Sequence, residues 1–420
     1  MAKRKRGGAA SAGDAPTATL VADDDVAQTF QKIFAALSEP AMTFLSQWLG
    51  IPRNATDRGV GLARPYTLAD AAAILENGTP YRRYFRPKSG GGVRRISEPA
   101  ASVKHVQRRL LHVVFPSIPV HHASFAGLRT RSAIEAIEWH AAQGKPFFKV
   151  DLKNAYPSVS RTRLTKVLRG PLQEYLARAA PHLVAEEYEA LINFVISICL
   201  DAGGLAQGAP TSLHLMNAAR FELDCALAAY LRSLPGSYTY TAYVDDLIIS
   251  RGDATEIPEY VRERIVRIVL AHGFLVNRSR RKRKVDYWPA GTGARRPVVL
   301  GLVPHRDGRV TISAKNRKRF RAALHHALSS PESSDAHRAQ VAGVMGYLHM
   351  VYGDDRLPSE LRVLYAQCRE RFGRPKTPGG AYPDIDCLLA EQHPGEGKAA
   401  DPHSEVDDAR ASGKPPTDSA

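Results

Sequence analysis

The sequence predicts an α+β fold, because β-prone runs and amphipathic helices are mixed through the middle of the chain and helices alone follow them. The strand-forming runs lie at 147–150, 238–243, 247–250 and 298–303. Helical spacing of apolar residues occurs at 186–200 and 258–272. Beyond Ser313, helical patterns continue at 315–328, 336–352 and 360–372. This order is typical of an α+β body followed by a helical C-terminal part.

The two ends of the chain differ from this body in composition. Residues 1–27 combine a basic start with Ala, Gly, Ser, Thr and Asp, and residues 375–420 are rich in Pro, Gly, Asp and Ser. Both are predicted to be disordered tails, because such compositions bury too little apolar surface to fold. Between them we expect an N-terminal helical layer at 28–78, an α+β region at 79–312 and a helical region at 313–374.

Composition narrows the class of partner. The 420 residues carry a net charge of +16 and include 44% apolar residues. Such an excess of positive charge favours nucleic acid as a partner, although a basic protein kept soluble by its charge is the simpler alternative. The four cysteines lie far apart, so we expect neither a zinc site nor a disulfide framework, but a reducing, cytoplasmic location. No apolar run is long enough to predict a membrane span.

Two adjacent carboxylates, Asp245 and Asp246, fall between the β-prone runs 238–242 and 247–249. The pattern therefore places them at the tip of a hairpin with buried arms. Neighbouring anions repel one another and are costly to desolvate unless a cation compensates them. Magnesium prefers one or two carboxylates together with phosphate oxygens of a substrate. A metal site and an ordinary Asp-rich turn are both consistent with this tetrapeptide.

A third carboxylate, Asp151, directly follows the strand-forming run 147–150. Alone, such an aspartate is usually a cap or turn residue. Two separate strand-borne carboxylate sites, however, are what a two-metal phosphoryl transferase requires. One ion activates the attacking hydroxyl and the other stabilises the leaving pyrophosphate, with the ions about 4 Å apart. The prediction is that Asp151, Asp245 and Asp246 hold two Mg²⁺ ions, with Mn²⁺ as the possible substitute.

Three ordered motifs resemble those of reverse transcriptases. Residues 147–159, Phe-Phe-Lys-Val-Asp-Leu-Lys-Asn-Ala-Tyr-Pro-Ser-Val, resemble the first palm motif of that family. Residues 207–212, Gln-Gly-Ala-Pro-Thr-Ser, resemble the substrate-binding motif, and residues 243–246, Tyr-Val-Asp-Asp, the catalytic box. The resemblance extends over roughly residues 80–350. It implies a right-hand polymerase with fingers, palm and helical thumb, which copies an RNA template into DNA from deoxynucleoside triphosphates.

The resemblance also implies roles for single residues. Asp151 and Asp245 would ligate both ions, with Asp246 as a weaker ligand. Tyr156 would stack under the sugar and exclude a 2′-hydroxyl, whereas without the resemblance it reads as a core tyrosine. Gln207 would contact the incoming nucleotide, and Gly208 would let the backbone approach it closely.

Residues 84–96 predict a strand, a glycine-containing turn and a second strand. They resemble the fingers hairpin of the family, whose basic residues hold the triphosphate. Arg94 is the first choice for this role, and Lys88 and Arg95 are the second. A solvated edge strand is the simpler alternative.

Basic residues further along the chain are expected to contact nucleic-acid phosphates. One group follows Asn277, and the other lies on the helix predicted at 315–328, which fits a thumb helix along a duplex. The general acid of the family falls in the first group, on Arg280 or, because arginine does not readily release a proton, on Lys282. The predicted contacts are Arg280, Arg281, Lys282, Arg283, Lys284, Arg317, Arg319 and Arg321.

Within the family, compact retron and defence-associated bacterial enzymes fit this chain length better than intron maturases or retroviral enzymes. Only His140 remains of the retron Asn-Ala-x-x-His pattern, Leu213 replaces a usual proline, and Val299-Leu300-Gly301 replaces Val-Thr-Gly. We therefore expect a divergent retron-like enzyme in antiviral defence, with a structured RNA template, a DNA product and an effector partner of unknown identity. A template-independent terminal transferase and a catalytically silent RNA-binding relic stay open.

Overall fold

In the computed structural model, the described residues are 24–51, 67–78, 80–87, 92–141, 146–253, 255–277, 285–288, 297–305, 308–329, 335–353 and 355–373. Helices and short antiparallel sheets alternate through them, which confirms the predicted α+β class. The chain divides into two compact units, and the boundary between them lies at Ala314 and Lys315.

The centre of the first unit is a four-stranded sheet with the order β6-β7-β3-β8. Its strands are β3 (Phe147–Asp151), β6 (Tyr238–Tyr243), β7 (Asp246–Arg251) and β8 (Val285–Trp288), and every neighbouring pair is antiparallel. The register pairs Asp151 with Asp246. Since side chains alternate between the faces of a sheet, Lys149 and Asp151 share one face of β3 with Asp246 on β7.

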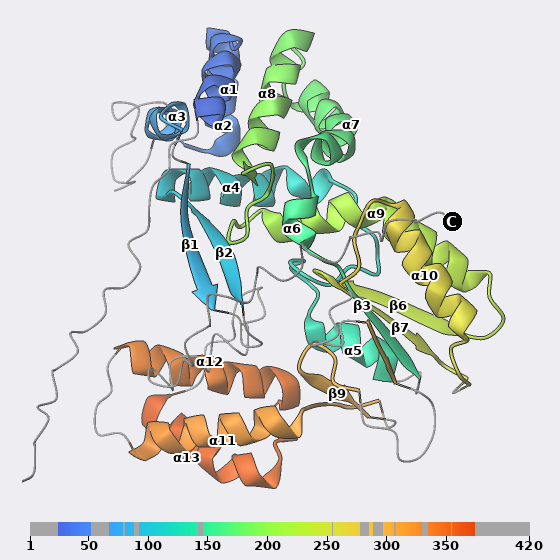
Figure 1. Ribbon diagram of the computed structural model, residues 1–420. Coiled ribbons are helices and arrows are strands. Elements are labelled where there is room, and N and C mark those ends of the chain that lie inside the picture. Colours follow the sequence, from blue (N-terminus) through green and yellow to red (C-terminus); the bar gives the residue numbers. More distant parts are fainter. Residues whose placement is uncertain are drawn as a thin grey trace, which may run out of the picture. The chain divides into compact units, whose positions relative to one another are not determined.

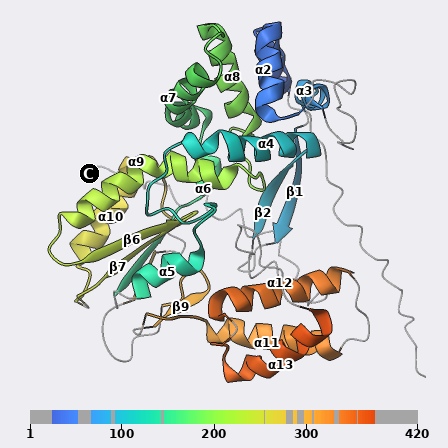
Figure 2. The same ribbon diagram turned by 180° about the vertical axis from the view of Figure 1, so that it is seen from behind.

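Helices cover both faces of this sheet (Figure 1). Helices α9 (Ser212–Arg232) and α10 (Glu259–Ala271) lie on one face and α5 (Ala133–Ala141) on the other. Two neighbouring residues of β6 show the alternation. The Tyr240 hydroxyl donates to Asp224 of α9 over 2.6 Å, whereas Thr241 hydrogen-bonds with His140 of α5 over 2.7 Å. Figure 2 shows the same two layers from behind.

His140 ties two strands of the sheet to α5. Its ring nitrogens lie 2.7 Å from the Ser250 hydroxyl and 2.7 Å from the Thr241 hydroxyl. The side chain is fully buried, and burial lowers its pKa to about 3. The ring is therefore neutral. The histidine that matches the retron pattern thus has one hydrogen-bond partner on β6 and one on β7.

The predicted strand, turn and strand at 84–96 are confirmed as β1 (Tyr81–Pro87) paired with β2 (Val93–Pro99). At the base of this hairpin, the Tyr81 hydroxyl donates to the carbonyl of Ile198 over 2.7 Å. The hairpin leads into α4 (Ala101–Val113), whose Gln107 donates to the same Tyr81 oxygen over 2.7 Å. The base is therefore anchored in buried polar contacts.

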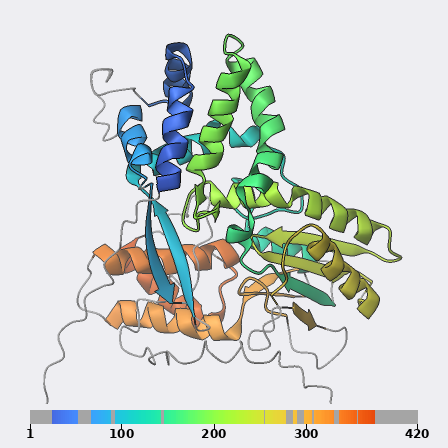
Figure 3. The same cartoon turned by 45° about the horizontal axis from the view of Figure 1, so that its top comes forward.

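A layer of helices is formed by the chain before Tyr81 and by the chain between β3 and β6 (Figure 3). It contains α1 (Asp24–Ala35), α2 (Glu39–Leu49), α3 (Leu68–Glu76), α7 (Arg161–Ala179) and α8 (Ala185–Ile198). Phe30 of α1 packs edge-on against Phe194 of α8, with ring centroids 6.1 Å apart. Helix α1 begins at Asp24, so it extends into the segment 1–27 that was predicted as a tail.

One carboxylate joins two helix starts in this layer. Glu187 accepts the amide of Val184, which precedes α8, over 3.0 Å. It also accepts the amide of Ser38 over 3.3 Å and the Ser38 hydroxyl, and Ser38 is the N-cap of α2. Glu187 therefore satisfies backbone donors that a helix start leaves unpaired, in two helices at once.

The strand predicted at 298–303 is wrong in its bounds. The observed strand β9 is Leu302–Pro304, and it pairs with β10 (Val310–Ile312). Residues 299–301 form a turn instead, with positive φ at Leu300 (53°) and Gly301 (77°). A β-prone composition cannot reveal this turn, because its left-handed backbone depends on the hydrogen bond from Val299 to Leu302.

The second unit consists of α11 (Ala314–Ser329), α12 (Asp335–Tyr352) and α13 (Ser359–Phe372). These confirm the three helices predicted beyond Ser313. The rings of Phe320 and Tyr347 stack with centroids 5.2 Å apart, and both side chains are buried. Across the described segments of the whole chain, no helix combines the length and apolar character that crossing a membrane requires.

Candidate active site

The structure brings the three predicted aspartates to one corner of the sheet. Asp151 ends β3 and lies opposite Asp246, the first residue of β7. Asp245 occupies the two-residue turn between β6 and β7 with Val244, which confirms the predicted hairpin tip. The Leu152 amide donates to the Asp245 carbonyl over 2.8 Å, so the turn is tied to the end of β3.

A lysine that the sequence analysis did not assign to the site lies among these carboxylates. Lys149 Nζ is 2.8 Å from Asp246 Oδ1. Burial raises the pKa of Asp246 to about 6, helped by the negative charges of Asp245 and Asp151 and opposed by Lys149. Burial acts to lower the pKa of Lys149, but the three carboxylates outweigh it and the net pKa is raised. Lys149 therefore stays cationic and compensates the second aspartate of the box.

The three carboxylates have the chemistry of ligands for divalent cations, but their side chains are not arranged around a common point. Within the described part of the chain, no three His, Cys, Asp or Glu side chains are grouped so that they could hold a metal ion. Carboxylate oxygens are nevertheless the ligands that Mg²⁺ prefers, and a divalent cation would relieve the crowded negative charge that raises the pKa of Asp246. Lys149 holds Asp246, and Asp151 and Asp245 stay the predicted main ligands of such ions.

Tyr156 lies within electrostatic reach of the catalytic turn. It belongs to the short helix α6 (Ala155–Ser158) and is half-buried. Burial raises its pKa most, the charge of Asp245 raises it further, and the charge of Arg94 lowers it. Tyr156, Asp245 and Arg94, each singled out by a different motif, are therefore near enough for their charges to influence one another.

The backbone of the predicted substrate-binding motif is docked on the fingers hairpin. The Ser97 amide of β2 donates to the Gln207 carbonyl over 2.8 Å. Gly208 has φ +123°, and a Cβ there would lie 3.1 Å from both the Ser97 carbonyl oxygen and the Ile96 side chain. The close approach that the structure shows at Gly208 is therefore to β2, while its approach to a nucleotide stays a prediction.

Arg94 and Arg95 are both exposed, and Arg95 lies near a carboxylate of a neighbouring segment, that of Asp201. Asp201 is buried, and its oxygens lie 2.5 Å from Arg83 Nη2 and 3.6 Å from Arg95 Nη2. Because neighbouring residues of a strand face opposite ways, Arg94 lies on the other face of β2. Arg95 thus faces Asp201 from one side of β2, and the role of Arg94 as a ligand for phosphate stays a prediction. Lys88 lies outside the described residues.

The structure describes only some of the residues that are predicted to contact nucleic acid. Residues 280–284 lie outside the described residues, and their prediction stays untested. On α11, Arg321 is exposed, and Arg317 and Arg319 are half-buried. Arg317 Nε pairs with Glu360 of α13 over 3.2 Å. Arg317 therefore has a partner within the helical unit, and Arg321 is the most accessible of the three to a nucleic acid.

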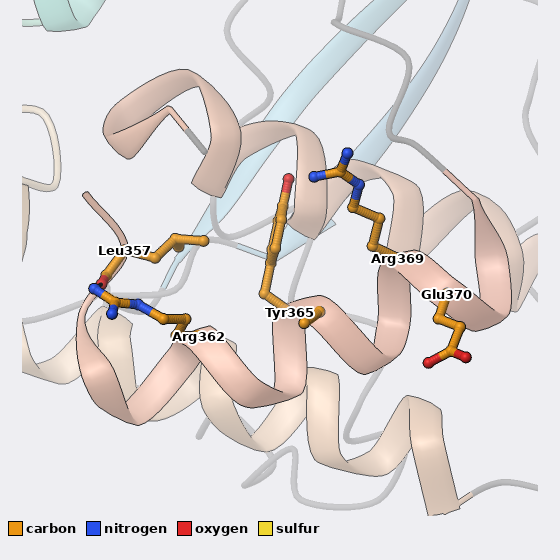
Figure 4. Close-up of a pocket in the computed structure, with 6 residues that line it drawn as sticks. Leu357, Arg362, Tyr365, Arg369 and Glu370 are labelled. Carbon is orange, nitrogen blue, oxygen red and sulfur yellow. Dashed lines mark hydrogen bonds between the residues drawn. The ribbon is translucent and has the colours of Figure 1, made fainter. Parts of the chain in front are cut away.

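The helical unit also contains a pocket of about 400 Å³ that none of the predicted site residues lines. Figure 4 shows Tyr365 standing between Arg362 and Arg369, which lie on the same helix, α13. The Arg362 guanidinium donates to the Leu357 carbonyl over 3.2 Å. The lining thus combines two arginines with the carboxylate of Glu370, all from α13.

Leu213, which stands where the family usually has proline, packs against a glycine. Gly127 has φ +69°, and a Cβ there would lie 2.6 Å from Leu213 Cβ. Leu213, at the start of α9, is therefore accommodated because residue 127 has no side chain.

An antiparallel sheet with paired carboxylates at a hairpin turn, a docked glycine loop and flanking helices is the palm architecture of right-hand polymerases. More narrowly, the chain is similar in sequence to retron reverse transcriptases. It is 32% identical over 297 residues to the retron Mx65 reverse transcriptase of Myxococcus xanthus, covering 70% of this chain and 65% of that protein. It is 30% identical to the retron Mx162 reverse transcriptase of the same organism, covering 70% of this chain and 62% of that protein.

The retron Ec86 reverse transcriptase of Escherichia coli is more distant, at 24% identity, but 83% of its length is covered. The chain thus spans slightly less than two thirds of the two Myxococcus relatives. No protein-family model matches it. Among solved structures, telomerase from Candida albicans aligns at a TM-score of 0.41 and 14% identity, covering 69% of this chain and 54% of that one. At that score the alignment carries no weight beside the sequence relatives.

Proposed function

We propose that this chain is an RNA-directed DNA polymerase of the retron type, with residues 79–312 as fingers and palm and 313–374 as thumb. The observation that carries the proposal is the register of β3 and β7, which sets Asp151 opposite Asp246 beside the turn that holds Asp245. Its homology to retron reverse transcriptases supports the same reaction.

In this proposal, Asp151 and Asp245 hold two Mg²⁺ ions and Asp246 supports them. When bound, the ions activate the primer 3′-hydroxyl and stabilise the charge that develops on pyrophosphate. Lys149 keeps Asp246 compensated and oriented, which limits the repulsion between the box carboxylates. Its contact explains why Asp246 would be the weaker ligand.

The nucleotide would lie between the carboxylate turn and the fingers hairpin. Arg94 would bind its triphosphate, with Lys88 and Arg95 as secondary ligands. Tyr156 would fill the space that a 2′-hydroxyl needs, and Gln207 would contact the nucleotide beside Gly208. The convergence of Arg94, Tyr156 and Asp245 supports this placement. The proton for the leaving pyrophosphate would come from Arg280 or Lys282, of which lysine gives up a proton more readily.

The template would be a dedicated structured RNA, held through phosphates by the basic residues 280–284 and by helix α11. The net charge of +16 and the exposure of Arg321 support this role. Shape more than base sequence would select the RNA, as is usual for paired RNA. The proposal extends to a role in antiviral defence, inside the cytoplasm and with an effector protein, and its motivation is the similarity to retron reverse transcriptases.

Extension of a defined primer by the purified full chain tests the reaction class. With Mg²⁺ and one deoxynucleotide at a time, we expect incorporation only of the nucleotide that the RNA template specifies. Equal incorporation without template would replace the proposal by a terminal transferase. RNA binding without any incorporation would replace it by a silent relic. Sequencing RNA that co-purifies from the native host identifies the template, and no enriched RNA would remove the dedicated template from the proposal.

A further inference from the structure

Arg220 is a fully buried arginine in the middle of α9, outside the three motifs that define the proposed active site. Its nearest charge partner is Asp224, one helical turn further on, with Arg220 Nε 2.9 Å from Asp224 Oδ1 and both side chains fully buried. Burying an arginine is costly unless the charge is paired and its donors are satisfied. Packing alone therefore does not explain why this ion pair is buried.

The donors of Arg220 reach two other parts of the chain and one further residue of its own helix. Nη2 donates to the Ser124 hydroxyl over 3.0 Å and to the Asn217 side-chain oxygen over 3.3 Å. Nη1 donates to the main-chain carbonyl of Val244. Asp224, in turn, accepts the hydroxyls of Tyr240 over 2.6 Å and of Ser124 over 3.2 Å. Arg220 thus links its own helix to residue 124 and to the turn before Asp245, and Asp224 links the same helix to β6.

Val244 has an unfavourable backbone conformation. Its φ is +55°, in the left-handed region that a β-branched residue rarely adopts. Such a conformation is strained and persists only where the surrounding structure holds it. The bond from Arg220 to the Val244 carbonyl is a contact of that kind. On the next peptide, the Leu152 amide holds the Asp245 carbonyl over 2.8 Å.

We propose that Arg220 is a positioning residue for nucleotidyl transfer. It holds the Val244 carbonyl, and together with Leu152 it fixes the two peptides that flank the Asp245 side chain. The direction in which Asp245 leaves the turn is therefore set from the helix that follows the substrate-binding motif. The inference rests on the proposed function, because the orientation of Asp245 matters for chemistry only if Asp245 is a metal ligand.

The Arg220→Lys variant distinguishes a positioning role of Arg220 from a packing role. Lysine keeps the charge beside Asp224, but its single nitrogen lacks the fork that reaches Asp224, Ser124 and Val244 together. Ser124→Ala is the matched control, because it removes a partner of the same guanidinium and leaves the Val244 bond in place. Asp224→Asn is the second test variant if the lysine variant does not fold, since it loosens the anchor of Arg220 and leaves every backbone group unchanged.

Two measurements are made on the full chain, namely steady-state primer extension and amide hydrogen exchange without metal or nucleotide. We expect Arg220→Lys to lower kcat by roughly 10- to 100-fold, as small misplacements of catalytic groups do, while KM for the primer–template stays near wild type. Exchange should rise in peptides covering the Leu152 amide and residues 243–247, with α7 and α8 unchanged. Ser124→Ala should show neither effect.

Wild-type kcat and unchanged exchange in Arg220→Lys would overturn the inference. A fall in kcat accompanied by faster exchange throughout the first unit would also overturn it, because Arg220 would then only stabilise the core. Failure of the proposed function would look different, since the wild-type chain would incorporate no nucleotide while the exchange of the turn still responded to Arg220→Lys.

Discussion

Lys149 and Asp246 form an ion pair inside the carboxylate corner, with 2.8 Å between Nζ and Oδ1, although they lie on neighbouring strands and almost a hundred positions apart in sequence. The pair supplies a positive charge where Asp151, Asp245 and Asp246 crowd together. The pair also distinguishes the two aspartates of the hairpin, since Asp246 has a lysine partner and Asp245 is the proposed metal ligand.

Lys149→Met keeps much of the side-chain volume and removes the charge. Without metal, we expect the free energy of unfolding to fall by about 1–3 kcal/mol, because the carboxylates lose their buried partner. Mg²⁺ should then stabilise the variant more than the wild type, since the cation replaces the missing charge. Denaturant unfolding with and without Mg²⁺ measures both effects.

The matched control is Lys166→Met. It breaks an ion pair with Glu222 whose side chains are 68% and 65% exposed, and such pairs contribute at most about 1 kcal/mol. Equal losses in the two variants, or an equal response to Mg²⁺, would contradict the role given to Lys149.

His140 makes the palm sheet sensitive to acid. Its pKa is about 3 in the folded chain against an ordinary value of 6.5, so below pH 6.5 the unfolded chain binds a proton that the folded chain does not. Stability should therefore fall as the pH decreases from 6.5 toward 3, by up to about 1.4 kcal/mol per pH unit from this group.

His140→Asn should be less stable at pH 7.5, because it loses hydrogen bonds to β6 and β7, but its stability should depend less on pH between 7 and 5. Urea unfolding across this range is the measurement. His325→Asn, at an exposed histidine of α11, controls for the loss of a ring. Parallel pH profiles for wild type and His140→Asn would show that His140 does not link stability to protonation.

Gly127 is expected to tolerate no side chain while Leu213 is present. Gly127→Ala imposes a left-handed backbone on alanine and a contact of 2.6 Å with Leu213 Cβ. Gly308→Ala, at φ +79° with no atom within 4 Å, imposes the backbone cost alone, about 1–2 kcal/mol. The loss of unfolding free energy in Gly127→Ala should exceed the loss in that control by about 1–3 kcal/mol, because of overpacking.

Thermal unfolding of a double-mutant cycle checks this explanation. Adding Leu213→Ala to Gly127→Ala should recover part of the loss, because it removes the atoms that collide. Additive losses in the double variant would show that the collision with Leu213 does not determine the cost.

Tyr156→Ala should relax the choice of sugar. The proposed function places the ring where a 2′-hydroxyl would lie, so its removal should raise incorporation of ribonucleotides relative to deoxynucleotides. Primer extension with each nucleotide type gives the ratio. Tyr243→Phe, which leaves a ring at the end of β6, is the control. An unchanged ratio in Tyr156→Ala would remove Tyr156 from the gate.

The parts that could be predicted from sequence are those with local signals. Alternating β-prone residues on both sides of Asp245 and Asp246 predicted the hairpin, and the family motifs predicted that Asp151 would join it. The helices after Ser313 follow from apolar spacing in the same way. In each of these elements, the pattern that predicts the element is also the pattern that is buried.

The unpredicted parts depend on register and tertiary contact. Lys149 is recognisable as a lysine in a buried strand, but its pairing with Asp246 requires the register of β3 and β7. Arg220 has a side chain that any exposed helix could carry, and only the folded chain shows its bond to the Val244 carbonyl. The turn at 299–301 likewise depends on left-handed residues that a β-prone composition conceals.

The most direct test of the central claim is template-directed incorporation of one deoxynucleotide by Asp245→Asn, compared with Asp151→Asn and the control Asp253→Asn. Asp253 is exposed and bonds Arg251 and Thr255 away from the carboxylate corner. We expect both site variants to lose nearly all incorporation while retaining RNA binding and a wild-type melting curve, and Asp253→Asn to remain active. Substantial incorporation by Asp245→Asn or Asp151→Asn would contradict the assignment of these carboxylates as the metal ligands of a polymerase.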